Sequence, residues 1–284
     1  MTKKFILNAD DFGMNSAFNT AVLEGCKSGI LKSASIVANG EGYDDAVKRV
    51  IPECQNLGIG VHLNIIEGKS ILNNIDEISD INRDFINSFP KLLIKSLNFY
   101  NKNFIKDVEY EFKAQIEKVL SSGINITHLD SHVHVHAIPP IFEVVCKLAK
   151  EYNIKQVRTQ FEKPYLIPDI YIHLNKKYPV NLIKIALLNT FSTINKKTIK
   201  KYNLETNDYL IGVGYTSMMN NMTVSYGLNI LKNKENIVAE ALIHPCRYED
   251  GIIDNHFTEY QITQSEKLKT AIENMGYEIG NYSF

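Results

Sequence analysis

Short runs of apolar and β-branched residues alternate along the chain with longer segments of helical periodicity. Seven runs predict strands, at Lys4–Ala9, Ser33–Ala38, Ile59–Asn64, Ile124–Leu129, Lys155–Arg158, Tyr209–Val213 and Ile237–Ile243. The segments between them predict helices at Ser16–Ser28, Tyr43–Pro52, Lys106–Ser121, Pro140–Tyr152, Thr223–Asn233 and Gln261–Met275. Alternating strands and helices are typical of a parallel sheet built from βα units. About seven units favour an α/β barrel or near-barrel over the alternative, an open doubly wound sheet.

Two stretches interrupt this alternation. Glu67–Ile105 and Phe161–Asn207 are rich in Asn, Lys and Ile and lack a clean period. We expect them to hold small helices over one end of the sheet and to line a substrate groove. Because the chain has no internal repeat, no Gly/Ser/Pro linker and no run of five like charges, one domain over residues 1–284 with these two insertions is predicted.

Composition narrows the class of protein. The 284 residues carry 31 Lys and Arg against 32 Asp and Glu, a net charge of −1, which argues against a nucleic-acid or anionic-membrane partner. No window reaches the roughly 20 apolar residues of a membrane span, and the first residues lack the apolar core of a secretory signal. A cytoplasmic protein is therefore expected. The four cysteines are scattered without a CxxC pair, which predicts buried free thiols.

Polar residues at the ends of the predicted strands indicate where chemistry takes place, because ligands of α/β folds bind at the carboxyl ends of strands. The first strand ends in Asp10-Asp11-Phe12-Gly13, and two adjacent carboxylates there are costly unless paired, solvated or bound to a metal. The alternative is a simple turn before a helix capped by Ser16. The third strand carries His62 near its end, which alone fits a core histidine better than a ligand.

A third motif changes that balance. Residues 128–136, His-Leu-Asp-Ser-His-Val-His-Val-His, hold four of the eight histidines of the chain. We expect His128 and Asp130 on a strand and His132, His134 and His136 in the loop that follows it. Histidine is the commonest metal-ligating side chain, whereas the alternative is a solvated polar loop.

Together these strand ends predict a metal site. Asp10 or Asp11, His62 and one histidine of the cluster would form a two-histidine, one-carboxylate set that leaves positions open for water and substrate. The second aspartate would then be available as a general base. Arg158 and His244 end two later strands: Arg158 could orient the base, bind substrate or form a surface ion pair, and His244 could be a general acid or a strand-end histidine bonded to backbone.

At these residues the chain resembles the YdjC-like carbohydrate deacetylases, which include chito-oligosaccharide deacetylase. The matching segments are residues 8–13, Gly60-Val61-His62, residues 127–136 and Ile243-His244-Pro245, and the resemblance extends from residue 4 to about residue 280. It implies a distorted (β/α) barrel related to polysaccharide deacetylases and hydrolysis of an N-acetyl group, a linear amide, from a sugar. Val133, where relatives often have histidine, and the segment after Pro245 depart from the family pattern.

The same resemblance implies the site roles. Metal ligands carry over to Asp11, His62 and His132, the base to Asp10, and supporting catalytic roles to His244 and Arg158. The implied metal is magnesium, although a set of two histidines and one aspartate also suits zinc or another transition ion.

Two other functions stay open from the sequence. One is a metal-dependent phosphoesterase, which usually needs more bridging carboxylates, and the other is a non-catalytic sugar- or metal-binding protein on the same barrel. An acetylated sugar or oligosaccharide is the expected partner, and a homodimer is compatible with the sequence.

Overall fold

The protein was analysed as a computed structural model, which describes residues 3–98 and 101–283. One sheet of parallel strands runs in the order β5-β4-β3-β2-β1-β7-β6, and an eighth strand, β8, pairs with the beginning of β1. The strands are β1 (Lys3–Phe12), β2 (Ser33–Ile36), β3 (Gly58–Leu63), β4 (Ile126–Ser131), β5 (Gln156–Val157), β6 (Tyr209–Ile211), β7 (Val238–Ile243) and β8 (Tyr277–Gly280). The predicted α/β class with parallel strands is confirmed.

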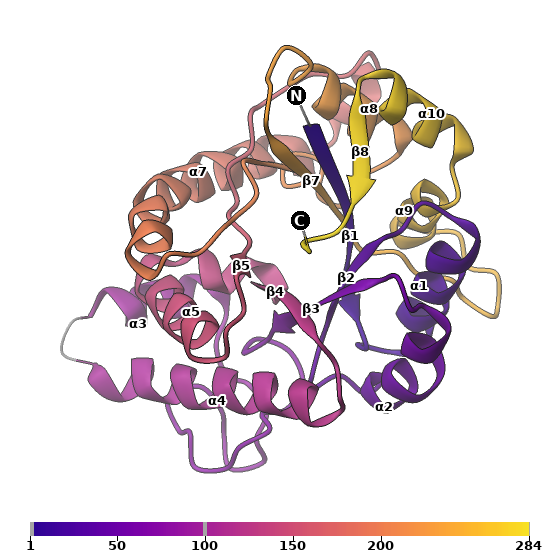
Figure 1. Ribbon diagram of the computed structural model, residues 1–284. Coiled ribbons are helices and arrows are strands. Elements are labelled where there is room, and N and C mark those ends of the chain that lie inside the picture. Colours follow the sequence, from indigo (N-terminus) through magenta and orange to yellow (C-terminus); the bar gives the residue numbers. More distant parts are fainter. Residues whose placement is uncertain (1–2, 99–100, 284) are drawn as a thin grey trace.

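Helices surround the outer face of the curled sheet (Figure 1). They are α1 (Ser16–Ser28), α2 (Tyr43–Asp45) with the short turns η1 (Ala46–Val50) and η2 (Ile51–Glu53), α3 (Phe89–Leu97), α4 (Lys102–Ser121), η3 (His132–Ala137), α5 (Pro139–Glu151), α6 (Ile170–Leu174), α7 (Lys177–Tyr202), α8 (Asn221–Asn229), α9 (Asn255–Thr263) and α10 (Glu266–Asn274). Within the described ranges, no helix is both long and apolar enough to cross a membrane.

The sheet forms a half-barrel whose two edges, β5 and β6, are joined by irregular backbone. The N–H of Leu210 in β6 donates to the carbonyl of Phe161, four residues beyond β5, over 2.8 Å. The side chain of Asn207 accepts from the N–H of Thr159 and donates to its carbonyl. A single backbone hydrogen bond and the side chain of Asn207 thus take the place of a regular ladder between β5 and β6, which is the distortion of the barrel.

All seven predicted strands are present, but β8 was not predicted. It has only four residues, Tyr-Glu-Ile-Gly, which is too short for a readable alternation, and it is held by pairing with Lys3–Ile6 of β1. The predicted helix at Gln261–Met275 is divided into α9 and α10. The break lies at Ser265, whose hydroxyl accepts the N–H of Leu268 and starts a new helix.

The expectation of small helices is wrong for the second insertion, residues 161–207. Most of it is α7, a single helix of 26 residues. Its buried side is partly polar, because Asn181 donates to the carbonyl of Gly214 and Asn195 to that of Ala137. Such a helix lacks the clean apolar stripe that reveals amphipathic helices in a sequence.

The expectation of four free thiols is wrong for one pair. Cys26 of α1 and Cys54, directly after η2, form a disulfide with their Cα atoms 6.0 Å apart. Their 28-residue separation hides the pairing in the sequence, and only the packing of α1 on η2 brings them together. Cys146 and Cys246 are buried free thiols as predicted.

Candidate metal and catalytic site

A cavity of about 530 Å³ opens at the carboxyl ends of β1, β3, β4 and β7. Five of the six predicted site residues line it: Asp10, Asp11, His62, His132 and His244. The strand ends therefore converge as predicted, from segments more than 200 residues apart. Within the described residues, Arg158 is absent from the cavity lining, and its side chain is fully buried beneath it.

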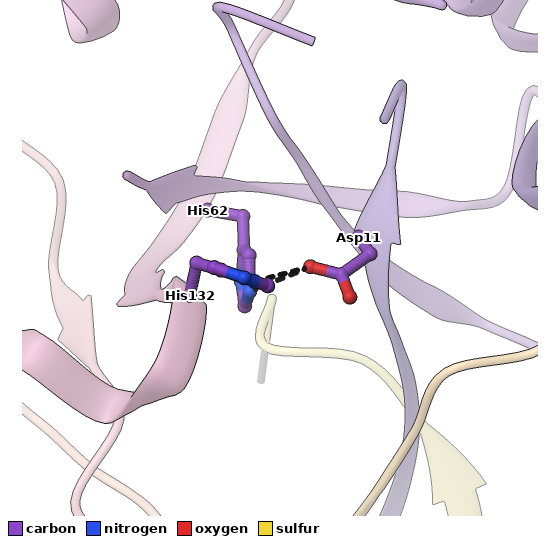
Figure 2. A group of neighbouring side chains, drawn as sticks. All are labelled: Asp11, His62 and His132. Carbon is purple, nitrogen blue, oxygen red and sulfur yellow. Dashed lines mark hydrogen bonds and ion pairs between the residues drawn. The ribbon is translucent and has the colours of Figure 1, made fainter. Parts of the chain in front are cut away.

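Asp11, His62 and His132 lie close enough to share one ion (Figure 2). Their ligand atoms all lie within 4.8 Å of one another. Oδ1 of Asp11 is 2.8 Å from Nδ1 of His132 and 3.3 Å from Nε2 of His62. The other nitrogen of His132 faces Glu67 at 3.3 Å, and Nδ1 of His62 contacts Asp130 at 2.8 Å. We call Asp11, His62 and His132 the open cluster, because it faces the cavity.

Local backbone geometry separates the two adjacent aspartates. The register between β1 and β2 shifts between Ala9 and Phe12, and Asp11 adopts a left-handed conformation with φ 61°. This irregularity turns Asp11 toward the histidines, whereas Asp10 faces Arg158. The turn interpretation of Asp10-Asp11 is not supported, because both residues lie within β1 and are buried.

Asp10 belongs to a second group, which we call the closed cluster: Asp10, Asp130, Arg158 and Glu240. Nη1 and Nη2 of Arg158 each donate to one oxygen of Asp10 over 2.7 Å. Nη2 also lies 2.9 Å from Asp130 and 2.6 Å from Glu240. Oδ1 of Asp10 accepts a further hydrogen bond from Asn8 over 2.8 Å. One guanidinium thus pairs with three carboxylates, and the surface ion pair considered for Arg158 is wrong, because its side chain is fully buried.

The charges of the open cluster depend on its neighbours. Burial acts to lower the pKa of His62, but the nearby carboxylates, Asp130 foremost, raise it to about 10. Burial acts to raise the pKa of Asp11, yet hydrogen bonds from His132 and His62 hold it well below its ordinary value. Without a metal, an anionic Asp11 therefore lies beside a protonated His62, and a bound cation would take the place of the proton between them.

In the closed cluster, the charges of Arg158 and the carboxylates around it stabilise one another. Burial acts to raise the pKa of Asp10, and the positive charge of Arg158 outweighs it, so that the pKa of Asp10 is lowered. The pKa of Arg158 is raised well above its usual value by the three carboxylates despite its burial. Burial raises the pKa of Glu240 to about 7, although Arg158 and the hydroxyl of Tyr282 act to lower it. Asp10 is therefore ionised and held in one orientation.

His244 also lines the cavity, and a carboxylate contacts its ring. Oε2 of Glu259 accepts from the backbone N–H of His244 over 2.5 Å and lies 3.3 Å from its Nδ1. Burial acts to lower the pKa of His244, but Glu259 raises it to about 9. His256 also lines the cavity, and its Nδ1 lies 2.8 Å from the carbonyl of His244. Sequence reasoning missed Glu259 and His256, since neither lies at a strand end.

The histidine cluster divides as the sequence suggested. His128 and Asp130 lie on β4, and the other three histidines lie on η3. Nε2 of His128 lies 3.0 Å from the hydroxyl of Ser35. His136 is bonded to Ser131, to Gln160 and to the carbonyl of Arg158. Both imidazoles are fully buried, and desolvation lowers their pKa values to about 3 for His128 and about 4 for His136.

The two insertions supply part of the cavity wall, as expected. Phe89 and Pro90 of α3 come from the first insertion, and Lys184, Leu187 and Leu188 of α7 come from the second. The floor is polar and charged, whereas these walls are mainly apolar.

The chain is similar in sequence to curated carbohydrate deacetylases. A carbohydrate deacetylase of Clostridium beijerinckii is 39% identical over 151 residues, which are 53% of this chain and 58% of that protein. A carbohydrate deacetylase of Geobacillus stearothermophilus is 31% identical over 196 residues, which are 68% of this chain and 75% of that protein. The first seven curated relatives are matched over only 57–59% of their own length.

Comparison with solved structures matches the fold over nearly the whole chain. A crystal structure of a proposed cellobiose-phosphate cleavage protein from Enterococcus faecalis superposes with a TM-score of 0.75 at 24% sequence identity, over 99% of this chain and 98% of that one. A family model described as "YdjC-like protein" matches residues 4–274. The chain belongs to the YdjC-like family.

Proposed function

We propose that this protein is a metal-dependent hydrolase that removes the acetyl group from N-acetylated sugars or oligosaccharides. The observation that carries the proposal is that two consecutive aspartates have different surroundings. Asp11 belongs to a group of side chains that could hold a metal ion, and Asp10 is held beside it by Arg158 as a second carboxylate. The relatives named carbohydrate deacetylase support the substrate class.

The donor chemistry of the open cluster fits a divalent cation. It offers one carboxylate and two imidazoles, and Nδ1 of His62 is bonded to Asp130, the usual way in which a carboxylate orients a metal-binding histidine. Magnesium is the ion implied by the family resemblance, and zinc or another transition ion suits the two imidazoles. A metal bound here would polarise the acetyl carbonyl and acidify a water molecule.

Asp10 is the proposed general base. Its Oδ1 already accepts two hydrogen bonds, from Arg158 and Asn8, whereas Oδ2 accepts one, from Arg158. A lone pair of Oδ2 is thus left to take the proton of a water molecule in the cavity. Arg158 acts as a positioning residue, because it fixes the carboxylate plane and keeps Asp10 ionised.

His244 is the proposed general acid. With a pKa of about 9 it carries a proton at neutral pH, and Glu259 holds its ring. In the proposed reaction, water oxygen bonds to the acetyl carbon while Asp10 takes the water proton. The C–N bond then breaks, His244 protonates the leaving amine, and acetate is released.

Acetate release tests the proposal directly. The metal-free protein, and the protein with Mg²⁺ or Zn²⁺ added, would be incubated with N,N'-diacetylchitobiose and other N-acetylated sugars. We expect acetate and free amine in equal amounts, only with metal. Metal binding without acetate from any of these sugars would instead favour a binding protein.

A two-metal phosphoesterase is not supported. The second potential ligand set, Asp10, His62 and Asp130, already holds the guanidinium of Arg158 against two of its three members. A cation in that set would have to displace a buried positive charge.

A further inference from the structure

His134 differs from the other histidines of the cluster. His128, His132 and His136 each have a hydrogen-bond partner for the ring. Across the described part of the chain, His134 has none, and its Nδ1 is a buried nitrogen without a partner. His134 nevertheless lines the cavity, together with the proposed base and acid.

The backbone that presents this ring is strained. Val133 and His134 both adopt left-handed conformations, with φ of 52° and 57°. This region is unfavourable for a β-branched residue such as valine, whose side chain is moreover 48% exposed and gains little from burial. Residues held in this way concentrate at ligand sites, where the surrounding structure compensates for the strain. The observed strain and the unpartnered nitrogen coincide at one residue.

The orphaned nitrogen indicates the tautomer. A buried N–H without an acceptor is rarer in proteins than an acceptor without a donor. We therefore assign the ring proton of His134 to Nε2 and leave Nδ1 unprotonated. Because Nδ1 is closed off while the ring lines the cavity, the edge facing the cavity carries the Nε2–H donor.

We infer that His134 is a specificity-determining residue whose Nε2–H donates a hydrogen bond to a substrate oxygen next to the reacting acetamide, a hydroxyl of the acetylated sugar. This inference rests on the proposed function. It accounts for an imidazole that contacts the cavity and contributes no hydrogen bond to the described protein. A neutral donor in the cavity lining would orient a sugar hydroxyl without adding charge.

Two substitutions separate donor from shape. His134→Phe keeps a ring and removes the donor, whereas His134→Gln places an amide N–H near the position of Nε2. On N,N'-diacetylchitobiose we expect kcat/KM to fall about 10–100-fold in His134→Phe, mainly through KM, and to recover at least partly in His134→Gln. Metal content should equal that of the wild type in both. The 3-deoxy and 6-deoxy analogues of the reacting sugar identify the oxygen: wild type should discriminate against one of them, and His134→Phe should not.

Thermal unfolding provides a readout independent of activity. Because His134 has an unpaired buried nitrogen, His134→Phe should leave Tm unchanged or raise it. The matched control His136→Phe removes an imidazole bonded to Ser131 and Gln160, and its Tm should fall.

The outcomes are distinct. Unchanged KM and kcat in His134→Phe, with wild-type turnover, would overturn the role of His134 and leave the deacetylase proposal standing. No acetate from any sugar with wild type would overturn the proposed function. In that case a fall of Tm in His134→Phe as large as in His136→Phe would mark His134 as structural and overturn the inference too.

Discussion

The open and closed clusters are in contact through His62 and Asp130, yet their carboxylates have different partners. In the open cluster, the Asp11 carboxylate faces two imidazoles and the cavity. In the closed cluster, Asp10 and Asp130 contact a buried guanidinium, with Asn8 and Ser35 as further donors. Carboxylates on consecutive residues, Asp11 and Asp10, thus acquire opposite properties: the first is available to a cation, and the second is already paired with the guanidinium of Arg158.

This contrast shows that the number of potential ligands is a poor guide to a metal site. Asp10, His62 and Asp130 also form a set of three potential ligands, but Arg158 places a permanent positive charge against its two carboxylates. The open cluster has no such permanent charge, and the proton of His62 can be released when an ion binds. The closed cluster has a different property: it holds the Asp10 carboxylate in a fixed orientation and in its ionised form, which general-base catalysis requires.

Loss of the metal should have the largest effect. Chelation should abolish acetate release, and Asp11→Asn, which replaces an anionic oxygen by a neutral one, should weaken metal binding more than about 100-fold. The matched variant Asp130→Asn keeps all three proposed ligands and removes the carboxylate that contacts Nδ1 of His62. Its metal affinity should therefore fall by about 10–100-fold. Metal titration with acetate-release assays measures both. Wild-type metal affinity in Asp11→Asn would remove the distinction between the clusters.

Asp10→Asn tests the other side of the same contrast. It removes the proton acceptor and none of the proposed ligands, so kcat should fall about 10²–10⁴-fold at unchanged metal content. The measurements are metal analysis and kcat for acetate release. If Asp10→Asn lost the metal while Asp11→Asn kept it, the two roles would be exchanged.

Removal of the positive charge of Arg158 should destabilise the fold. Arg158→Met leaves three buried carboxylates without their partner, and we expect the free energy of unfolding to fall by about 3–5 kcal/mol. Arg49→Met is the control, because Arg49 pairs with Asp45 on an exposed helix turn and should cost under about 1 kcal/mol. Urea unfolding measures both. Equal losses would mean that Arg158 does not organise the closed cluster.

Part of this contrast could be read from the sequence. Apolar runs that end in Asp10-Asp11 and His62, together with the histidines of residues 128–136, located the strand ends and therefore the open cluster. Because the carboxyl ends of parallel strands lie at the same edge of a sheet or barrel, these residues were expected to lie near one another. Periodicity alone did not choose between His132 and His134, and the choice of His132 came from the family resemblance.

Most of the closed cluster could not be predicted from the sequence. Glu240 is one polar residue inside an apolar strand, and its partner Arg158 lies 82 positions away. A local pattern cannot distinguish a glutamate facing solvent from one facing a buried arginine, because the stabilising charge comes from another strand. For the same reason the sequence left a surface ion pair open as one interpretation of Arg158, whose side chain is in fact fully buried.

The smallest expected effect concerns the pair His244 and Glu259, which belongs to neither cluster. Here a carboxylate fixes the charge of a histidine that remains at the cavity. The pKa of His244 is about 9 in the folded protein, above the roughly 6.5 of an unfolded histidine. Between these values the folded state binds more protons than the unfolded state, so stability falls as pH rises. The contribution is complete below about pH 6.5 and lost as pH rises through about 9.

Urea unfolding of wild type and His244→Gln at several pH values between 6 and 10 tests this. The difference in stability should shrink by about 1–2 kcal/mol over that interval, less than the full shift allows because the ring is partly accessible. Glu259→Gln should flatten the same slope, since it removes the charge that raises the pKa. If both variants kept the wild-type slope, Glu259 would not control the protonation of His244. The acid role would then need another proton source, because burial alone lowers the pKa of an imidazole.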